Sequence, residues 1–409
     1  MPHASFVTHL EGAIDGAILP ARTIHTTHRD RPILVRYDLD AVANAVSPAD
    51  FHARPYTMWR YRELLPVDDE TCIVSLDETV TPLLACPRLG RRLGAPNLYI
   101  KDESRLPTGS FKSRGMAMAV SMARQFGITA LAAPTAGNAG GALAAYAARA
   151  GIDCALFMPA DTPIVNRAEA VLHGARVFLV NGLINDCGRL VREGADALGW
   201  FDMSTLKEPY RIEGKKTMGL ELAEQFHWHL PDAILYPTGG GTGLIGMAKA
   251  FDELEQLNWL GTETRPRLYV CQSSGCAPIV NAFHANQRFA QPPPDPYTVA
   301  AGLRVPVAVG DFLMLDAVRE SGGSAIAADE RRIAEWMALA SRTEGISLCP
   351  ESAICLGALE QALAAGEIRP DDRIVIFNTA AAQKYIEVMP ADIPTIDHTT
   401  PVDWATLFP

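Results

Sequence analysis

The stretch DAILYPTGGGTGLIGMAKAF, residues 232–251, contains the pattern on which the fold assignment depends. Its first residues are apolar and typical of a buried strand, and the segment after Thr242 repeats apolar residues at helical spacing. Between the two segments stand four glycines in five positions, from Gly239 to Gly243. A strand, a glycine turn and a helix in this order predict one βαβ unit of a parallel sheet.

The same alternation of short β-rich runs and helical segments continues along the chain, although the first 60 or so residues show no strong pattern. It predicts an α/β fold in which parallel sheets are covered by helices on both faces. Open sheets of this kind bind ligands at the carboxyl ends of their strands, where the glycine clusters fall. The expected strands are 97–103, 130–137, 153–160, 176–182, 200–205, 232–239, 267–274 and 373–380.

Composition and charge limit the classes of function. The 409 residues exceed one typical domain and suggest about two or three. A net charge of −11 argues against a general affinity for nucleic acid or anionic membranes. No apolar run reaches the length of a membrane span, and the N-terminal MPHASFVTHLEGAIDGA lacks a basic segment, so we expect a cytoplasmic protein. Eight scattered cysteines without CxxC spacing predict free thiols and no metal site.

The glycine turn after the strand at 232–236 indicates an anion site. The backbone N–H groups of Gly239 to Gly243 can converge on a phosphate, and the dipole of the following helix favours negative charge at that point. A tight turn alone needs fewer glycines, so we favour a phosphate cradle.

Part of the same turn, GTGLIG, also fits the GxGxxG pattern of a nicotinamide-dinucleotide site. Such a site needs an acidic residue at the end of the next strand to hold the ribose. That strand, RLYVCQSS (267–274), ends in Gln272 and serines, which weakens the dinucleotide interpretation.

The segment LPTGSFKSRG (106–115) places a lysine in an unusual position. The helical pattern downstream predicts a helix that begins at about Ser110 or Phe111, with Ser110 as its N-cap. Lys112 then lies in the first turn, where the helix dipole disfavours an ammonium group. An amine at that position, near a phosphate cradle, has a depressed pKa and is nucleophilic. The aldehyde cofactor that carries its own phosphate is pyridoxal 5′-phosphate, which an amine binds as an imine.

A second glycine cluster, APTAGNAGGALAAY (133–146), again follows a strand and opens a helix. Thr135 and the N–H groups around Gly137 to Gly140 form a nest suited to a carboxylate, and Asn138 adds an amide. A plain helix cap explains the same residues, and this motif alone does not separate the two interpretations.

Several motifs together resemble threonine synthase, of the β-family (fold type II) of pyridoxal-phosphate enzymes. The resemblance runs from about Tyr37 to Tyr385. It implies a tryptophan synthase β-like fold with two parallel or mixed sheets flanked by helices. It also implies a large cofactor-binding domain (1–116 plus 213–409), a small domain (117–212) and an active site between them. The motifs are MWRYRELLPV (58–67), KDESRLPTGSFKSRG (101–115), PTAGNAGG (134–141), EPYRIEGKKTMGLELAEQ (208–225), GGGTGLIG (239–246) and AAGLRVP (300–306).

The resemblance implies roles for single residues. Lys112 is implied as the Schiff-base lysine, Asn138 as the partner of the 3-hydroxyl of the cofactor, and Thr379 as the partner of its pyridine nitrogen. Arg211 matches an arginine that the family uses for the phosphate of the substrate, and Lys384 is a second candidate. The implied cofactor-binding residues are Lys112, Phe111, Asn138, Gly239, Gly240, Gly241, Thr242, Gly243 and Thr379. The implied substrate-binding residues are Thr135, Gly137, Asn138, Ser110, Arg211 and Lys384.

The chain departs from the family pattern at positions that concern the substrate. The usual NPTGSFK reads LPTGSFK, with Leu106 in place of asparagine. The glycine-rich TGHGLK or TGSGLK reads TAAAQK, with Ala380, Ala381 and Ala382 in place of glycine-rich residues. STLKEP (204–209) stands where the family often has an asparagine-rich turn.

We therefore expect a pyridoxal-phosphate-dependent lyase with threonine synthase activity, which converts O-phospho-L-homoserine and water into L-threonine and phosphate. The expected partner is a small amino-acid substrate, with no nucleic acid and no membrane, and the resemblance suggests a homodimer. Three alternatives stay open. They are a related enzyme of β-elimination or β-replacement acting on threonine, serine or phosphoserine, an NAD-binding oxidoreductase, and a cofactor-binding protein without turnover.

Overall fold

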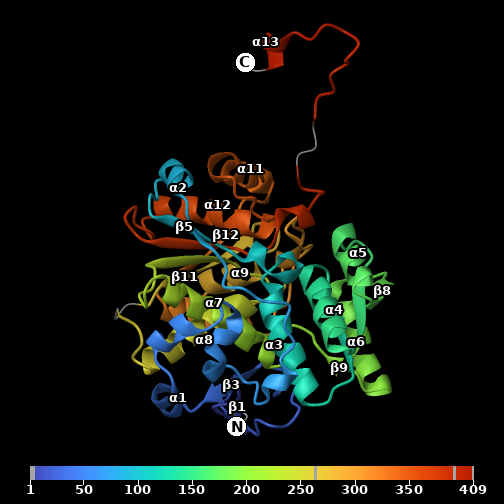
Figure 1. The fold of residues 1–409 in the computed structure, drawn as a ribbon. Coiled ribbons are helices and arrows are strands. Elements are labelled where there is room, and N and C mark those ends of the chain that lie inside the picture. Colours follow the sequence, from blue (N-terminus) through green and yellow to red (C-terminus); the bar gives the residue numbers. More distant parts are fainter. Residues whose placement is uncertain (1–4, 262–264, 390–392, 408–409) are drawn as a thin grey trace.

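The largest sheet of the molecule has the strand order β12-β11-β10-β13-β5-β4 (Figure 1). The computed structural model describes residues 5–261, 265–389 and 393–407. All neighbouring strands of this sheet are parallel except β4, which runs antiparallel to β5. The strands are β4 (Leu83–Ala85), β5 (Leu98–Asp102), β10 (Ala233–Pro237), β11 (Arg267–Ser273), β12 (Ser324–Ala328) and β13 (Ile374–Asn378).

Two smaller sheets accompany it. The order β8-β7-β6-β9 forms a parallel sheet from the middle of the chain, and β2-β1-β3 forms an antiparallel sheet near the N-terminus. The middle strands are β6 (Ala130–Pro134), β7 (Asp153–Pro159), β8 (Arg176–Val180) and β9 (Phe201–Asp202). The N-terminal strands are β1 (Val7–Gly12), β2 (Ile18–Leu19) and β3 (Ile33–Tyr37).

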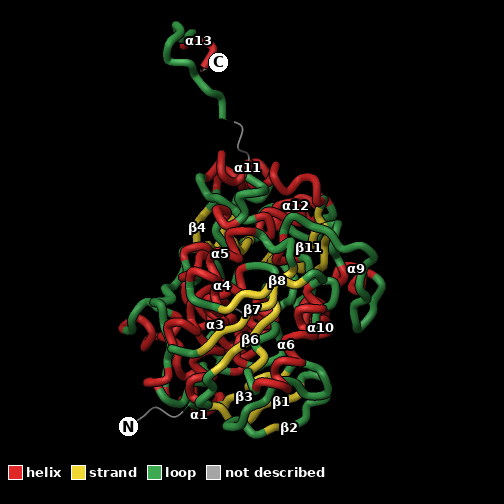
Figure 2. Tube along the Cα trace, turned by 90° about the vertical axis from the view of Figure 1, so that its right-hand side faces the viewer, coloured by secondary structure: helices red, strands yellow, loops and turns green. Residues whose placement is uncertain are grey.

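Helices cover both faces of the six-stranded sheet (Figures 1 and 2). Alternate residues of a strand point to opposite faces, and β10 follows this rule. Ile234 and Tyr236 pack in one core with α7 (Tyr210–Gln225) and α8 (Thr242–Gln256). Ala233 and Leu235 pack in a second core with α11 (Ile333–Glu344) and α12 (Pro350–Ala364). Because both faces are buried, these strands are continuous apolar runs without polar alternation.

Among the described residues, no helix combines the length and the hydropathy of a membrane span. The helices are α1 (Leu39–Ala45), α2 (Pro87–Leu93), α3 (Lys112–Gln125), α4 (Asn138–Ala150), α5 (Ile164–Leu172), α6 (Ile184–Leu198), α7 (Tyr210–Gln225), α8 (Thr242–Gln256), α9 (Pro278–His284), α10 (Asp311–Glu320), α11 (Ile333–Glu344), α12 (Pro350–Ala364) and α13 (Trp404–Leu407).

The α/β class and the eight predicted strands are confirmed, with end positions that differ by a few residues. The pattern missed β12, because four of the five residues of its sequence SAIAA are small residues with little preference for strands. It also missed β4 and the N-terminal sheet, whose strands are short or only partly buried.

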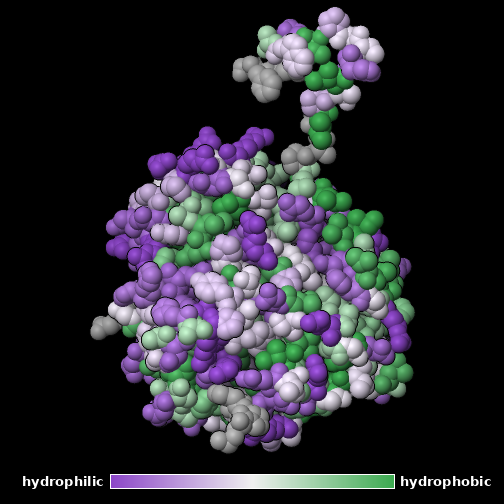
Figure 3. Space-filling model, in the orientation of Figure 1, coloured by the Kyte–Doolittle hydropathy of each residue, from purple (hydrophilic) through white to green (hydrophobic). Residues whose placement is uncertain are grey.

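Apolar side chains gather on the surface where α5 and β8 lie (Figure 3). β8 is an edge strand of the four-stranded sheet, and its exposed side chains continue onto the neighbouring helices. The large apolar residues of this surface, each at least 48% exposed, are Ile164, Val171, Leu172, Phe178, Leu179 and Leu183.

A fully buried ion cluster joins α3 to α7 and β5. The guanidinium of Arg114 pairs with Glu103 (Nε to Oε2, 2.6 Å) and with Glu221 (Nη2 to Oε2, 2.8 Å). The ammonium of Lys101 also donates to Glu221 Oε2 at 2.8 Å. Burial lowers the pKa of Lys101, while Glu221 and Glu103 oppose that shift. The cluster holds α3 against α7 two residues after Lys112.

We expect Glu221→Leu to destabilise the protein strongly, because it leaves Arg114 and Lys101 buried with too little negative charge. Removing one partner of a buried ion pair costs about 3–5 kcal/mol. Urea unfolding followed by circular dichroism measures the change. The matched control is Arg189→Gln, which breaks an exposed pair with Glu193 and should cost less than about 1 kcal/mol. Equal midpoints for Glu221→Leu and the control would contradict the structural role of the cluster.

Candidate active site

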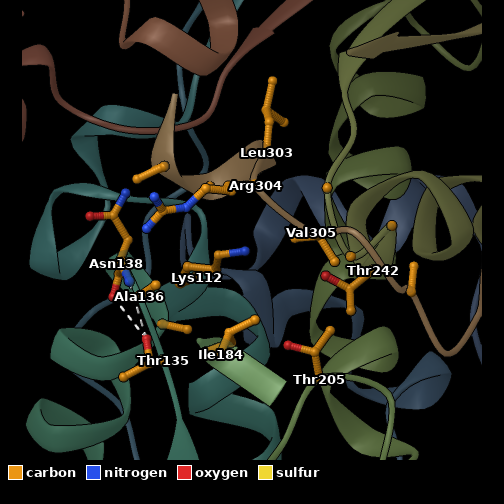
Figure 4. Close-up of a pocket in the computed structure, with 18 of the residues that line it drawn as sticks. Lys112, Thr135, Ala136, Asn138, Ile184, Thr205, Thr242, Leu303, Arg304 and Val305 are labelled. Carbon is orange, nitrogen blue, oxygen red and sulfur yellow. Dashed lines mark hydrogen bonds between the residues drawn. The ribbon is translucent and has the colours of Figure 1, made fainter. Parts of the chain in front are cut away.

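A cavity of about 350 Å³ opens where strands of the two parallel sheets end (Figure 4). Its walls come from the residues that follow β6, β10 and β13 and from the first turn of α3. This is the edge at which open α/β sheets bind ligands. Of the residues predicted for the site, the cavity is lined by Phe111, Lys112, Thr135, Gly137, Asn138, Gly239, Gly240, Gly241, Thr242, Gly243 and Thr379.

The turn before α3 sets the position of Lys112. Thr108 adopts a left-handed conformation (φ 58°), and the Phe111 N–H donates to the Thr379 carbonyl at 2.9 Å. The prediction that Ser110 caps the helix is wrong. Ser110 is extended and forms a bridge with Ala380, so the helix begins only at Lys112. The hydroxyl of Ser110 is buried and has no partner among the described residues.

The Lys112 amine lies in an environment that disfavours its charge. Burial, and to a smaller extent the positive charge of Arg211, lower the pKa of Lys112 to about 7 against the opposing effect of Glu351. The amine lies 4.4 Å from the centroid of the Phe111 ring. Within the described part of the chain it makes no hydrogen bond, so it is free to react.

A second buried lysine lies on the same aromatic ring. Lys215 Nζ is 3.8 Å from the Phe111 centroid and donates to the Phe111 carbonyl. Burial holds the pKa of Lys215 well below its usual value, with added repulsion from Lys112 and Arg211. Lys215 does not line the cavity, whereas Lys112 does.

The glycine turn after β10 has the properties of an anion cradle. In the described residues, the N–H groups of Gly239, Gly240, Gly241 and Thr242 have no hydrogen-bond acceptor. They lie at the start of α8, which no side chain caps. Such N–H groups at a helix N-terminus attract a phosphate.

Packing also requires some of these glycines. A Cβ at Gly239 would lie 2.2 Å from the Gly302 carbonyl oxygen, and Gly241 has a positive φ of 79° beside Met314. A Cβ at Gly240 would lie 2.9 Å from Thr205, so the turn that contains Thr205 covers the cradle. Figure 4 shows Thr205 and Thr242 on the same side of the cavity.

The start of α4 offers a second set of free donors. The Thr135 hydroxyl accepts from the N–H groups of Gly137 (3.3 Å) and Gly140 (3.1 Å), which fixes the turn. The N–H groups of Ala136 and Asn138 have no acceptor among the described residues. The side-chain oxygen of Asn138 is also buried without a partner. This turn can hold a carboxylate.

Thr379 follows β13 and is 4% exposed. Its N–H donates to the Ser352 hydroxyl at 2.9 Å, and its own hydroxyl lies 3.4 Å from that of Ser352 and 3.6 Å from the Cys349 sulfur. Thr379 thus lines the cavity from a well-packed position, with its hydroxyl beside those two polar side chains.

The end of β11 carries no acidic residue that could hold the ribose of a nicotinamide dinucleotide. Gln272 is fully buried; its amide donates to the Thr238 carbonyl, and its oxygen accepts from the N–H groups of Ile279 and Val280. Gln272 therefore supports the turn after β10 and has no free group for a ribose.

Three predicted residues do not line the cavity: Ser110, Arg211 and Lys384. Arg211 is 2% exposed, and its guanidinium donates to the Met203 carbonyl at 2.9 Å. Burial raises the pKa of the neighbouring Glu208 to about 7. Lys384 donates to Glu169 Oε2 at 2.6 Å and to the Thr108 carbonyl at 2.9 Å.

The cavity also contains charged residues that the sequence analysis did not assign. Arg304 points from the turn at 301–304 toward the side of the cavity that Asn138 occupies (Figure 4). It pairs with Asp161 at 3.0 Å. Its motif AAGLRVP was recognised, but nothing in the pattern marked the arginine. The other unassigned charged residues that line the cavity are Arg192, Lys207 and Glu351.

Together these residues fit pyridoxal 5′-phosphate. The cavity offers a buried amine with a pKa of about 7 for an aldehyde and four free N–H groups for a phosphate. For the ring substituents it offers the Asn138 amide, whose oxygen has no partner among the described residues, and the Thr379 hydroxyl. The groups come from four separate elements and converge on one cavity.

Comparisons with known proteins agree with this fit. Residues 74–380 match the family described as pyridoxal-phosphate dependent enzyme. The threonine synthase of Methanocaldococcus jannaschii is 35% identical over 85% of this chain and 85% of that protein. The threonine synthase of Mycobacterium tuberculosis is 32% identical over 85% of this chain and 94% of that protein.

Solved structures share the fold at lower identity. Maize serine racemase superposes with a TM-score of 0.63 at 21% identity, covering 80% of this chain and 90% of that one. Threonine deaminase isoform 2 from Solanum lycopersicum gives 0.64 at 20% identity, with 82% and 94% covered. The fold type II architecture is therefore confirmed, and the chain belongs to the pyridoxal-phosphate dependent enzyme family, within its threonine synthase group.

Proposed function

We propose that the protein is a threonine synthase that converts O-phospho-L-homoserine and water into L-threonine and phosphate. The observation that carries the proposal is the buried Lys112 amine, which faces four unpaired N–H groups at the start of α8 across one cavity. The family relation supports the choice of substrate.

When bound, pyridoxal phosphate supplies an electron sink for negative charge on the carbon next to an amino-acid nitrogen. Gly239 to Thr242 hold its phosphate, and Asn138 and Thr379 contact its ring substituents in this proposal. The turn at 135–138 holds the carboxylate of the substrate in this proposal, because its residues line the cavity and the N–H groups of Ala136 and Asn138 have no acceptor among the described residues.

Lys112 carries protons in the proposed reaction. It is neutral above a pKa of about 7, so at neutral pH a large fraction can accept a proton from the substrate Cα and return one to the carbon chain. The hydroxyl group of the product comes from water, and the phosphate leaves with the remaining proton. A residue whose pKa lies near the operating pH can both accept a proton and donate one.

The phosphate of the substrate needs cations near this cavity. Arg211 lies behind the wall, close enough to Lys112 to lower its pKa, while Arg304 and Lys207 line the wall itself. We keep Arg211 as the proposed phosphate residue, with Ser110 and Lys384 as further substrate contacts. The domain division at 117–212 and a homodimer are proposed from the family relation, and a cytoplasmic location is proposed from the composition of the sequence.

We expect wild-type protein with pyridoxal phosphate to absorb at roughly 410–430 nm, and Lys112→Ala to lose this band and its turnover, since the amine that bonds the aldehyde is gone. Borohydride reduction and peptide mapping should find the cofactor on Lys112. The matched control is Lys215→Met, which removes the other buried amine near Phe111 and should keep the band. Cofactor attached at Lys215 would refute the assignment.

We also expect the rate at which the apoprotein binds pyridoxal phosphate to depend on pH. Burial lowers the pKa of Lys112 to about 7, so the reactive neutral amine increases as pH rises through 7 and is nearly saturated by about pH 8. Stopped-flow measurement of the visible band gives the midpoint. Arg211→Met removes a nearby positive charge and should move the midpoint upward. A rate that still rises steeply near pH 10 is incompatible with the buried amine.

For the substrate, we expect phosphate release from O-phospho-L-homoserine together with threonine formation. Arg211→Met should lower kcat/KM at least about tenfold, which corresponds to a loss of about 1.4 kcal/mol of transition-state binding. Its effect on an unphosphorylated amino acid should be much smaller. If Arg304→Gln has this effect and Arg211→Met does not, the phosphate lies on the cavity wall. Deamination of threonine or serine without phosphate release from O-phospho-L-homoserine would contradict the synthase proposal and support the β-elimination enzyme.

A further inference from the structure

A chain of three hydrogen-bonded side chains runs along the cavity wall. The amide nitrogen of Asn138 donates to the Tyr385 hydroxyl at 2.8 Å, and this hydroxyl donates to Glu351 Oε1 at 2.8 Å. The Gly302 N–H donates to the same carboxylate oxygen at 2.8 Å. All three side chains line the cavity and are at most 8% exposed.

The direction of these bonds is fixed by the number of hydrogens. Two donors converge on Glu351 Oε1, so this oxygen accepts. Tyr385 has one hydroxyl hydrogen, and it is used on Glu351. The Tyr385 oxygen can then only accept from Asn138, which turns the amide nitrogen toward the tyrosine. A carbonyl oxygen of Asn138 at that position would face the lone pairs of Tyr385.

The hydroxyl also keeps its hydrogen over the working pH range. Burial raises the pKa of Tyr385 well above its usual value, and the charge of Glu351 raises it further. The Asn138 side-chain oxygen has no partner among the described residues. Only one N–H of the amide donates to Tyr385, so the second N–H is not needed for that bond.

We infer that Glu351 and Tyr385 are positioning residues that orient the Asn138 amide so that its second N–H donates to the 3-oxygen of bound pyridoxal phosphate. The inference rests on the proposed function, which places Asn138 beside that oxygen. The chain connects α4 with α12 and with the segment after β13, so it also joins the two parallel-sheet regions across the cavity.

Other charged or titratable groups near the chain are Lys112 from α3, Arg211 from α7, Arg304 from the turn at 301–304, and Cys349 before α12. In the described structure none of them donates to or accepts from the three side chains. The substitutions below remove hydrogen bonds among the three side chains and leave the charges of these other groups in place.

The test is the visible spectrum of the cofactor-loaded enzyme as a function of pH. In Tyr385→Phe or Glu351→Leu the Asn138 amide is no longer held, and the 3-oxygen anion loses an N–H donor. A hydrogen bond to the charged form lowers a pKa, so the midpoint of the spectral change should move upward by about one pH unit. The double variant should shift no further than either single variant, because both act through Asn138.

Two variants separate orientation from other effects. Glu351→Gln removes the negative charge but retains a carbonyl oxygen that can accept from Tyr385, so its midpoint should stay close to wild type. Tyr269→Phe is the matched control: Tyr269 is also a buried tyrosine, in β11, and its hydroxyl donates to the Glu367 carbonyl, away from the cavity. Tyr269→Phe should leave the visible band of the cofactor and the pH midpoint of its spectral change as they are in the wild type.

Unchanged midpoints in both Tyr385→Phe and Glu351→Leu would overturn the inference, and the presence of the band would leave the proposed function standing. A full shift in Glu351→Gln would also overturn it, because charge alone would then explain the effect. If Glu351→Leu does not fold, Tyr385→Phe decides the question. A wild-type protein without any visible band would reject both the inference and the proposed function.

Discussion

The hydrogen bond from the Phe111 N–H to the Thr379 carbonyl connects the start of α3 to the end of β13. The rest of the site depends on this contact. It places Lys112 at the cavity wall and brings the Thr379 hydroxyl to the same wall. Two residues after Lys112 in α3, the buried cluster of Arg114, Glu103 and Glu221 holds the helix from the side away from the cavity. The reactive amine is therefore held by backbone and ion pairs that take no part in the chemistry.

Different elements supply the groups that bind different parts of the ligands in the cavity. The start of α8 supplies unpaired N–H groups for a phosphate, the start of α4 supplies them for a carboxylate, and α3 supplies the amine. Two helix N-termini that face one cavity favour anions on both sides. Burial between them removes water from Lys112, and this is the main reason why its pKa falls to about 7.

Much of this site could be predicted from sequence. The strand, glycine turn and helix at 232–251 and the cluster at 133–146 marked two helix N-termini, because local composition determines such turns. Lys112, which the sequence places at the start of α3, lines the cavity. Arg211 shows the limit: its motif matched the family, yet its side chain lies behind the wall beside Glu208. The direction of a side chain depends on the elements that pack around it, and the spacing of residues in a motif does not reveal which elements these are.

The sequence by itself determined the α/β class, the approximate strands and the residues most suited to hold pyridoxal phosphate, because hydrophobic periodicity and glycine turns are local properties. Only the tertiary structure decided that Ser110 is extended and leaves the capping position, since its backbone pairs with Ala380. Only the tertiary structure brought Glu351, Tyr385 and Asn138 into one hydrogen-bonded chain. Asn138 lies more than 200 positions before Glu351 and Tyr385 in the sequence, and the sheets that fold between them create the contact.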